Sequence, residues 1–261
     1  MKVVRFASMT VALCLSVFGC ATPEKPDPWE PMNRGIFAFN ETVDKYALEP
    51  AATAWDFVVP GVAQTALDNF FSNLQMPTIF ANDLLQGKPK AAMYDVFRLL
   101  YNSVFGLGGF IDVATMVDIP KNDEDFGQTL GVWGFPAGPY LMMPLLGPYT
   151  LRSGAGQVVD IGAASYAYFT PFWSGVVGLN GIETFGASTG QKGLELLNLR
   201  AIFLEEVEAN RRDAFDYYIF IRNAYLQNRR AKVLDQTDAP VIDDEFYFFD
   251  EDEEEEDYDD L

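Results

Sequence analysis

Cys20 is the residue whose surroundings most clearly predict covalent chemistry. The first five residues include the basic residues Lys2 and Arg5. The uncharged and mostly apolar stretch Phe6–Phe18 follows, and Gly19 lies directly before the cysteine. This order is typical of an export signal that is cut after a small residue, and the residues before the cysteine resemble a lipobox. The apolar stretch is too short to span a bilayer, which takes about 20 residues. We therefore predict a signal peptide over residues 1–19 and acylation of Cys20.

The residues after Cys20 fit a membrane tether. Residues 20–28 are polar and proline-rich, and each buried CH₂ of an acyl chain contributes about 0.8 kcal/mol, so several chains hold a protein on a membrane. The residue after Cys20 is Ala21 and not an aspartate. This pattern resembles that of lipoproteins sorted to an outer membrane. The alternative is a plain secretory signal in which Cys20 is an incidental thiol.

A second group of polar residues lies in an unusually uncharged part of the chain. Between residues 126 and 182 the only charged side chains are Arg152 and Asp160, among 11 glycines and five prolines. Prolines at this spacing exclude a straight spanning helix, and irregular backbone is tolerated at membrane depth only where protein buries it or where it lines a watery cavity. We interpret the segment as short, broken or re-entrant pieces. A buried, glycine-rich loop layer of a soluble domain is the alternative.

Four polar side chains in this segment are candidate channel or headgroup contacts: Gln128, Arg152, Gln157 and Asp160. Arg152 could bind a phosphate through charge-assisted hydrogen bonds. Its alternative role is an internal ion pair with Asp160.

The composition argues against catalysis. The chain has no histidine and only two cysteines, which excludes imidazole-based nucleophilic sites and thiolate metal sites. The adjacent acids Glu124 and Asp125 could act as a base, but neighbouring residues on a helix point apart, and no G-x-S-x-G elbow occurs. We expect no enzyme activity, no cofactor and no metal. A net charge of −20 also disfavours nucleic acid as a partner.

Periodicity predicts a mostly α body over residues 29–234, with weak strand patterns throughout. Apolar residues recur at helical spacing in Val62–Leu74, which Pro77 is expected to end, and most clearly in Met93–Val104, whose stripe indicates core or membrane-plane packing rather than a lipid contact. Two further helices are expected over 193–210 and 211–234. Residues 235–261 hold 15 acidic and no basic residues, which predicts a solvated, disordered tail. A docking segment for a basic partner is the alternative there.

Several long motifs occur in one collinear order over residues 27–230. They are DPWEPMNR from Asp27 with Phe39-Asn40, NDLLQG from Asn82, NSVFGLGGFID from Asn102, FGQTLG from Phe126, and GPY from Gly138 continuing to Leu151-Arg152. Together these motifs resemble the VacJ/MlaA family of outer-membrane lipoproteins. The candidate functional residues within these motifs are Asn33, Arg34, Phe39 and Asn40.

The resemblance implies a compact, ring-like assembly of amphipathic and broken helices that lie in the membrane plane around a central channel. It implies a lipoprotein on the periplasmic face of the outer membrane, associated with a trimeric porin. Such a protein removes misplaced phospholipids from the outer leaflet, passes them to a soluble periplasmic carrier, and so maintains lipid asymmetry. A structural lipoprotein that tethers or scaffolds a porin without moving lipid is the alternative.

Overall fold

The computed structural model describes residues 26–164 and 181–236, which are predominantly helical. The elements in chain order are α2 (Glu30–Val43), the π-helix η1 (Asp44–Leu48), α3 (Glu49–Val58), α4 (Gly61–Leu85), α5 (Pro89–Val104), α6 (Val113–Met116), α7 (Phe126–Val132), β1 (Tyr140–Met143), β2 (Gly147–Thr150), α8 (Leu151–Ala164), α9 (Gly181–Ile202), α10 (Leu204–Asp213) and α11 (Tyr217–Val233). The predicted signal peptide, Cys20 and most of the acidic tail lie outside the described residues.

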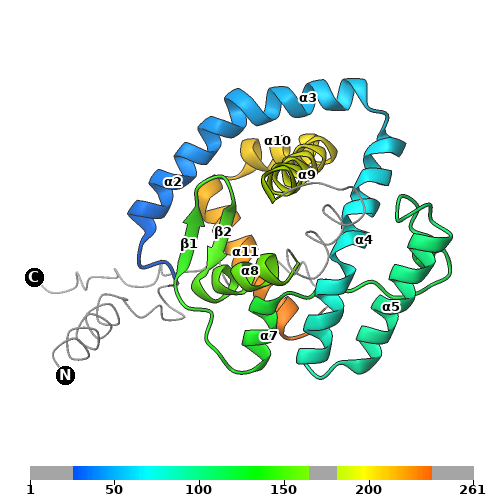
Figure 1. Ribbon diagram of the computed structural model, residues 1–261. Helices are drawn as coiled ribbons and strands as arrows, with labels where there is room; N and C mark the ends of the chain where they lie inside the picture. The colour runs from blue at the N-terminus through cyan, green and yellow to red at the C-terminus, as the bar shows by residue number, and fades with distance from the viewer. Residues whose placement is uncertain (1–25, 165–180, 237–261) are drawn as a thin grey trace, which may run out of the picture.

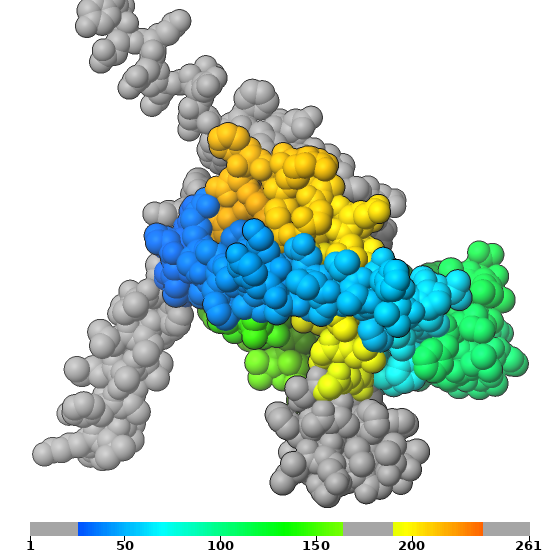
Figure 2. Space-filling view, turned by 90° about the horizontal axis from the view of Figure 1, so that it is seen from above, coloured from blue at the N-terminus to red at the C-terminus, as the bar shows by residue number. Residues whose placement is uncertain are grey.

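The helices follow one another around a ring (Figure 1). α2, η1 and α3 form one continuous arc, α4 forms the next side, α7 and α8 lie opposite the arc, and the β1–β2 hairpin stands against α2. α9 lies inside the arc and α5 packs on the outside of α4. Seen from above, α2 and α3 run across the middle of the body, and α10 and α11 lie to one side of them (Figure 2). The mostly α, ring-like arrangement expected from the sequence is confirmed.

Helix α4 continues through Pro77, so the expectation that this proline ends the helix is wrong. A proline inside a helix is less favourable than alanine by about 3 kcal/mol. Burial on both sides of it outweighs this cost, because Met76 and Ile79 are almost fully enclosed and α4 packs against α5 and α9.

Residues 140–150 form an antiparallel hairpin that periodicity did not reveal. β1 and β2 pair Tyr140 with Thr150 and Met143 with Gly147. Each strand has four residues, which is too short for an alternating pattern to be recognised in a single sequence.

The last part of the chain forms three helices where the sequence predicted two. α9 runs to Ile202, α10 covers Leu204–Asp213, and α11 begins at Tyr217. The second break is specified locally, because the side chain of Asp216 accepts a hydrogen bond from the backbone N–H of Ile219 and caps α11.

Candidate functional site

The interior of the described residues is more polar than apolar. Seventeen polar or charged residues are buried against ten apolar ones, while Phe57, Val62 and Val104 are among many large apolar side chains left exposed. Soluble domains usually show the opposite distribution, and large exposed apolar surfaces mark contact with a membrane or a partner. Across 26–164 and 181–236, no helix has both the length and the hydropathy needed to cross a bilayer. The body therefore has a polar inside and an apolar outside without a spanning helix.

Helix α5 shows this inversion most clearly. Its apolar stripe from Met93 to Val104 faces outward, whereas Asp95, Arg98 and Asn102 on the opposite face are at most 6 % exposed. The amphipathic helix predicted here is confirmed, but packing of its stripe in a core is wrong. The stripe is available to meet lipid.

Arg98 explains why a charged face can be buried on α5. Its guanidinium donates to both carboxylate oxygens of Asp112, at 2.7 and 2.8 Å, and to the carbonyl oxygen of Ile119. Burial alone would raise the pKa of Asp112, but hydrogen bonds from Thr115 and Asn102 and the charge of Arg98 lower it below its usual range. These bonds fold the segment after α5 back over its polar face.

A second polar node joins α4, α7 and α8. Asn82 donates to Asp160 Oδ1 at 3.0 Å and accepts from the hydroxyl of Thr129, and Asp160 Oδ2 accepts from the backbone N–H of Phe126. Burial raises the pKa of Asp160 above its usual value. The helices approach closely enough for this node because two glycines meet.

The glycine contact lies between Gly127 on α7 and Gly156 on α8. A Cβ atom built on Gly156 would lie 2.2 Å from the backbone nitrogen of Gly127, so only glycine is compatible with this crossing. Asp125 caps α7 by accepting from the backbone N–H of Gln128 and forms a two-pronged ion pair with Arg229 of α11. Three helices are thereby fixed around one corner of the ring.

The motif residues Asn33 and Asn40 connect α2 to the hairpin. Asn33, fully buried, donates to the carbonyl oxygen of Tyr140 and accepts from the N–H of Met142. Asn40 donates to the carbonyl oxygen of Met143 and accepts from the N–H of Leu145. The two side-chain amides thus replace a neighbouring strand along β1.

The other two motif residues lie differently. Arg34 pairs with Glu30 and with Asp216, the cap of α11, and so ties the two helices together. Its guanidinium also lies over the ring of Tyr218, 4.5 Å from the centroid. Phe39 is half-exposed on α2.

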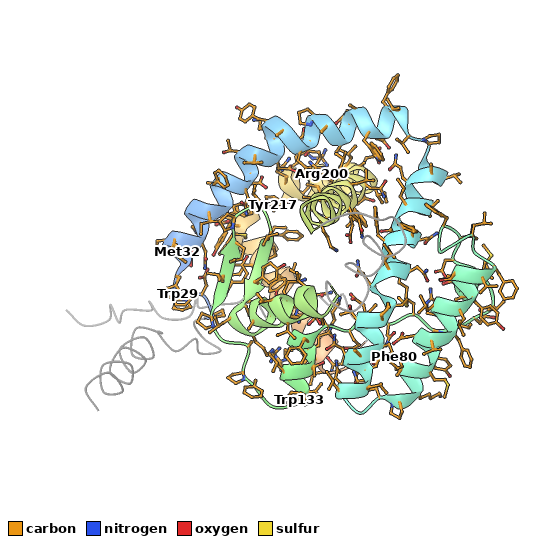
Figure 3. All side chains as sticks on the ribbon, viewed as in Figure 1. Trp29, Met32, Phe80, Trp133, Arg200 and Tyr217 are labelled. Carbon is orange, nitrogen blue, oxygen red and sulfur yellow. The ribbon has the colours of Figure 1, made fainter. Side chains whose placement is uncertain are left out.

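A charge network joins the arc to α9 and α10. Arg200 and Arg211 lie beneath η1, where Asp44 accepts hydrogen bonds from both at 2.8–3.1 Å; Figure 3 labels Arg200 under the arc. Burial would raise the pKa of Asp44, but the two guanidinium groups lower it. The π-helix is therefore held by paired charges rather than by apolar packing.

The four polar candidates of the charge-poor segment do not converge on one point. Gln128 is buried and donates to the carbonyl oxygen of Asp123, and Asp160 belongs to the node with Asn82. Gln157 is exposed on α8, and Arg152 donates to the carbonyl oxygen of Phe135 at 2.8 Å.

The ion pair between Arg152 and Asp160 considered from the sequence is wrong, since each has the other partners named above. The two residues are eight positions apart on one helix, which separates them by about 12 Å along its axis.

Sequence reasoning missed the buried carboxyl pair of Asp83 and Asp95, which face each other from α4 and α5. The available signal was the polar face of α5, on which Asp95 lies. The adjacent acids Glu124 and Asp125 are both engaged, by Lys88 and Arg229 respectively. No group of three metal-ligating side chains gathers anywhere in the part of the chain that the structure describes.

Comparison with known proteins agrees with this architecture. The family model described as MlaA lipoprotein matches residues 25–232. The intermembrane phospholipid transport system lipoprotein MlaA of Haemophilus influenzae is 37% identical over 231 residues, covering 85% of this chain and 87% of that protein. The protein of the same name from Escherichia coli K12 is 36% identical, covering 85% and 86%.

A solved structure also matches, described as "Structural basis for maintenance of bacterial outer membrane lipid asymmetry". It has a TM-score of 0.67 and 34% identity, and the match covers 79% of this chain and 98% of that one. The helical ring with its hairpin, the motifs in collinear order and these matches over most of the chain lead to one conclusion: the chain belongs to the MlaA lipoprotein family.

Proposed function

We propose that this protein moves phospholipids between the membranes of a bacterial envelope. It removes misplaced phospholipids from the outer leaflet of the outer membrane and passes them to a soluble periplasmic carrier. The relatives named for intermembrane phospholipid transport support this assignment. The observation that carries it is the inverted distribution of polar and apolar side chains, with a polar interior and exposed apolar residues around the ring.

The physical task explains the inversion. A charged headgroup is very unfavourable in hydrocarbon, so a protein that moves lipid needs a polar path for the head beside apolar surfaces for the tails. A ring with polar side chains inward and apolar side chains outward offers both environments while it lies in the membrane plane. Gln157, exposed on α8, and Arg152 are the sequence candidates that remain open to such contacts.

We infer that the protein is held on the periplasmic side of the outer membrane through acylated Cys20, after removal of residues 1–19. The side of the body that bears α10 (Figure 2) fits an aqueous compartment, because Glu205, Glu206 and Arg212 are exposed there. Replacing Cys20→Ser should leave the precursor uncleaved, which mass spectrometry of the intact chain would detect. A Cys20→Ser protein with a normal mature mass and outer-membrane location would contradict the anchor.

We further propose that a trimeric porin holds the ring in the outer membrane and that transport involves no covalent chemistry. Glu124 and Asp125, the acids that could serve as a base, are committed to Lys88 and Arg229. Incubation of the pure protein with labelled phospholipid should release neither fatty acid nor headgroup. Co-purification with the porin after crosslinking in cells tests the partner.

The transport role is tested in cells. Deleting the gene should raise the phospholipid content of the outer leaflet, measured by labelling of surface-exposed headgroups, and the complete chain should restore it. Unchanged surface phospholipid in the deletion strain would overturn the proposal.

A porin tether without lipid movement predicts a different result. The chain has cysteines only at positions 14 and 20, so an added cysteine can be modified selectively. A bulky maleimide on Gln157→Cys should block lipid movement and leave porin binding intact, whereas the same label on Lys45→Cys, exposed on η1, should have no effect. Normal lipid movement with labelled Gln157→Cys protein would favour the tether.

A further inference from the structure

Arg152 is a half-buried cation without an acidic partner. Of the nine arginines among the described residues, seven contact a carboxylate. The other two are Arg152 and Arg230, and Arg230 is exposed on α11. Desolvation of an uncompensated guanidinium is unfavourable, so Arg152 needs an explanation that Arg230 does not.

The guanidinium of Arg152 is held in place but left with free donors. Nη1 donates to the carbonyl oxygen of Phe135 at 2.8 Å, and the group lies close to α7, where a Cβ on Gly131 would be 3.0 Å from Cζ. The buried Nε has no acceptor, and no hydrogen bond from Nη2 occurs within residues 26–164 and 181–236. Because protein encloses Nε, Nη2 is the donor that remains for an acceptor from outside.

The local charge favours an anion. Burial lowers the pKa of Arg152, and the neighbouring positive charge of Arg229 lowers it further. Asp125, which pairs with Arg229, opposes this shift, but no carboxylate of the described residues forms an ion pair with Arg152 itself. A positive charge with a free N–H donor on Nη2 matches an oxygen of a phosphate group.

The surface beside Arg152 is apolar and aromatic. Val132, Trp133 and Phe135 are exposed, as are Leu84 and Leu85 at the end of α4. Trp133 lies at the edge of the ring (Figure 3), and its indole N–H donates to the carbonyl oxygen of Leu85 at 3.0 Å, so its ring can enter an apolar medium without an unpaired donor. We call these five residues the apolar edge. Aromatic side chains next to a cation are typical of the level of lipid headgroups.

We propose that Arg152 binds the phosphate of a phospholipid whose acyl chains lie against the apolar edge. The site holds one lipid at the rim of the ring. It rests on the membrane placement given under the proposed function but does not require that lipid move.

The experiment uses the purified full-length lipoprotein in a phosphate-free maltoside detergent. Quenching of tryptophan fluorescence is titrated with phosphatidylglycerol that carries brominated acyl chains, and with diacylglycerol of the same chains, which lacks the phosphate. Phosphatidylglycerol should bind about tenfold more tightly than diacylglycerol, as expected for a charge-assisted hydrogen-bonded contact. Because this comparison uses the unchanged protein, it does not depend on any variant folding.

Variants then locate the phosphate contact. Arg152→Gln should bring phosphatidylglycerol binding down to the diacylglycerol level, and Arg152→Lys, which keeps the charge but loses the planar fork, should lie between. Arg230→Gln removes the same charge from an exposed position on α11 and should have no effect.

Three results would overturn the proposal. They are equal binding of the two lipids, an equal loss with Arg230→Gln and Arg152→Gln, and displacement of the lipid by inorganic phosphate at the same concentration, which would indicate a site for free anions. The assay is separate from surface phospholipid in the deletion strain, so failure of the transport proposal and failure of this site are distinguishable.

Discussion

Asn33 and Asn40 lie seven residues apart on one face of α2 and bind the hairpin at two points three residues apart. Asn33 bonds the backbone on both sides of Leu141, at 2.9 and 3.1 Å, and Asn40 bonds it on both sides of Pro144, at 2.8 and 3.0 Å. Seven residues of helix rise about 10.5 Å, and three residues of strand extend about 10 Å. The distance between the two asparagines along α2 therefore matches the distance between the two points that they bind on the hairpin.

This relationship predicts separate local effects of two substitutions. Asn33→Ala should speed hydrogen exchange at the amide of Met142, and Asn40→Ala at the amide of Leu145, because each removes the acceptor of that N–H. Each should lower the free energy of unfolding by about 1–3 kcal/mol, with the buried Asn33 at the upper end. Hydrogen exchange followed by mass spectrometry on peptides that separate the two amides measures both.

A matched control is Asn69→Ala, since Asn69 makes only a long 3.4 Å bond to the carbonyl oxygen of Phe110 at an exposed position. It should leave hairpin exchange unchanged. Equally faster hydrogen exchange at both hairpin amides in either variant would show that the two asparagines do not hold the hairpin independently.

The glycine crossing of α7 and α8 predicts a strong contrast between two substitutions on one helix. Gly156→Ala would place a Cβ against the backbone of Gly127 and should lower the free energy of unfolding by about 3 kcal/mol, at the upper end of overpacking. Gly162→Ala, with open space around it, should be neutral or more stable by about 0.5–1 kcal/mol. Chemical denaturation in detergent compares them, and similar values for both would contradict the tight crossing.

The paired carboxyls of Asp83 and Asp95 predict a pH dependence of stability. Burial, a hydrogen bond from one carboxyl to the other and the charge of Asp83 raise the pKa of Asp95 to about 8. Arg98 on the same helix opposes this shift, and Glu124 from the segment before α7 adds to it. An aspartate in the unfolded chain titrates near pH 3.9, so the folded state binds the extra proton between about pH 4 and pH 8.

Stability must therefore fall as pH rises through that window, because the folded state binds more protons than the unfolded state. The melting temperature should be lower at pH 8 than at pH 5, and Asp95→Asn should flatten this part of the profile. Asp68→Asn, on α4 but outside the carboxyl pair, serves as the control and should keep the wild-type slope. If the melting temperature of the Asp95→Asn protein fell with pH as steeply as that of the wild type, the carboxyl pair would not bind the extra proton.

The outward stripe of α5 predicts that the helix meets hydrocarbon. Leu100 is about half-exposed, so Leu100→Glu would be harmless in water but unfavourable at membrane depth, by up to about 3 kcal/mol. Binding of a chain that lacks residues 1–20 to phospholipid vesicles should weaken at least tenfold. Glu206→Gln on α10 is the control and should bind as before. Undiminished vesicle binding by the Leu100→Glu chain would place α5 outside the lipid.

Local sequence was sufficient to predict a structural feature where the cause of that feature is local. Pro89 begins α5 at its first helical position, where proline is favoured, and the helix ends before the glycines that follow Val104. The long motifs also identified the family, because their order along the chain needs no knowledge of packing. Pro77 shows the limit, since its effect on α4 depended on burial against other helices.

Sequence alone determined that α5 has an apolar and a polar face, but tertiary structure decided which of them is inside. An amphipathic pattern has the same period whether the apolar face meets a core or a lipid, so the pattern cannot distinguish the two. The partners that make burial of Arg98 favourable, Asp112 and Ile119, lie 14 and 21 residues away. Likewise, Asn33 and Asn40 meet the hairpin across more than 100 residues, a distance over which only the folded chain brings donors and acceptors together.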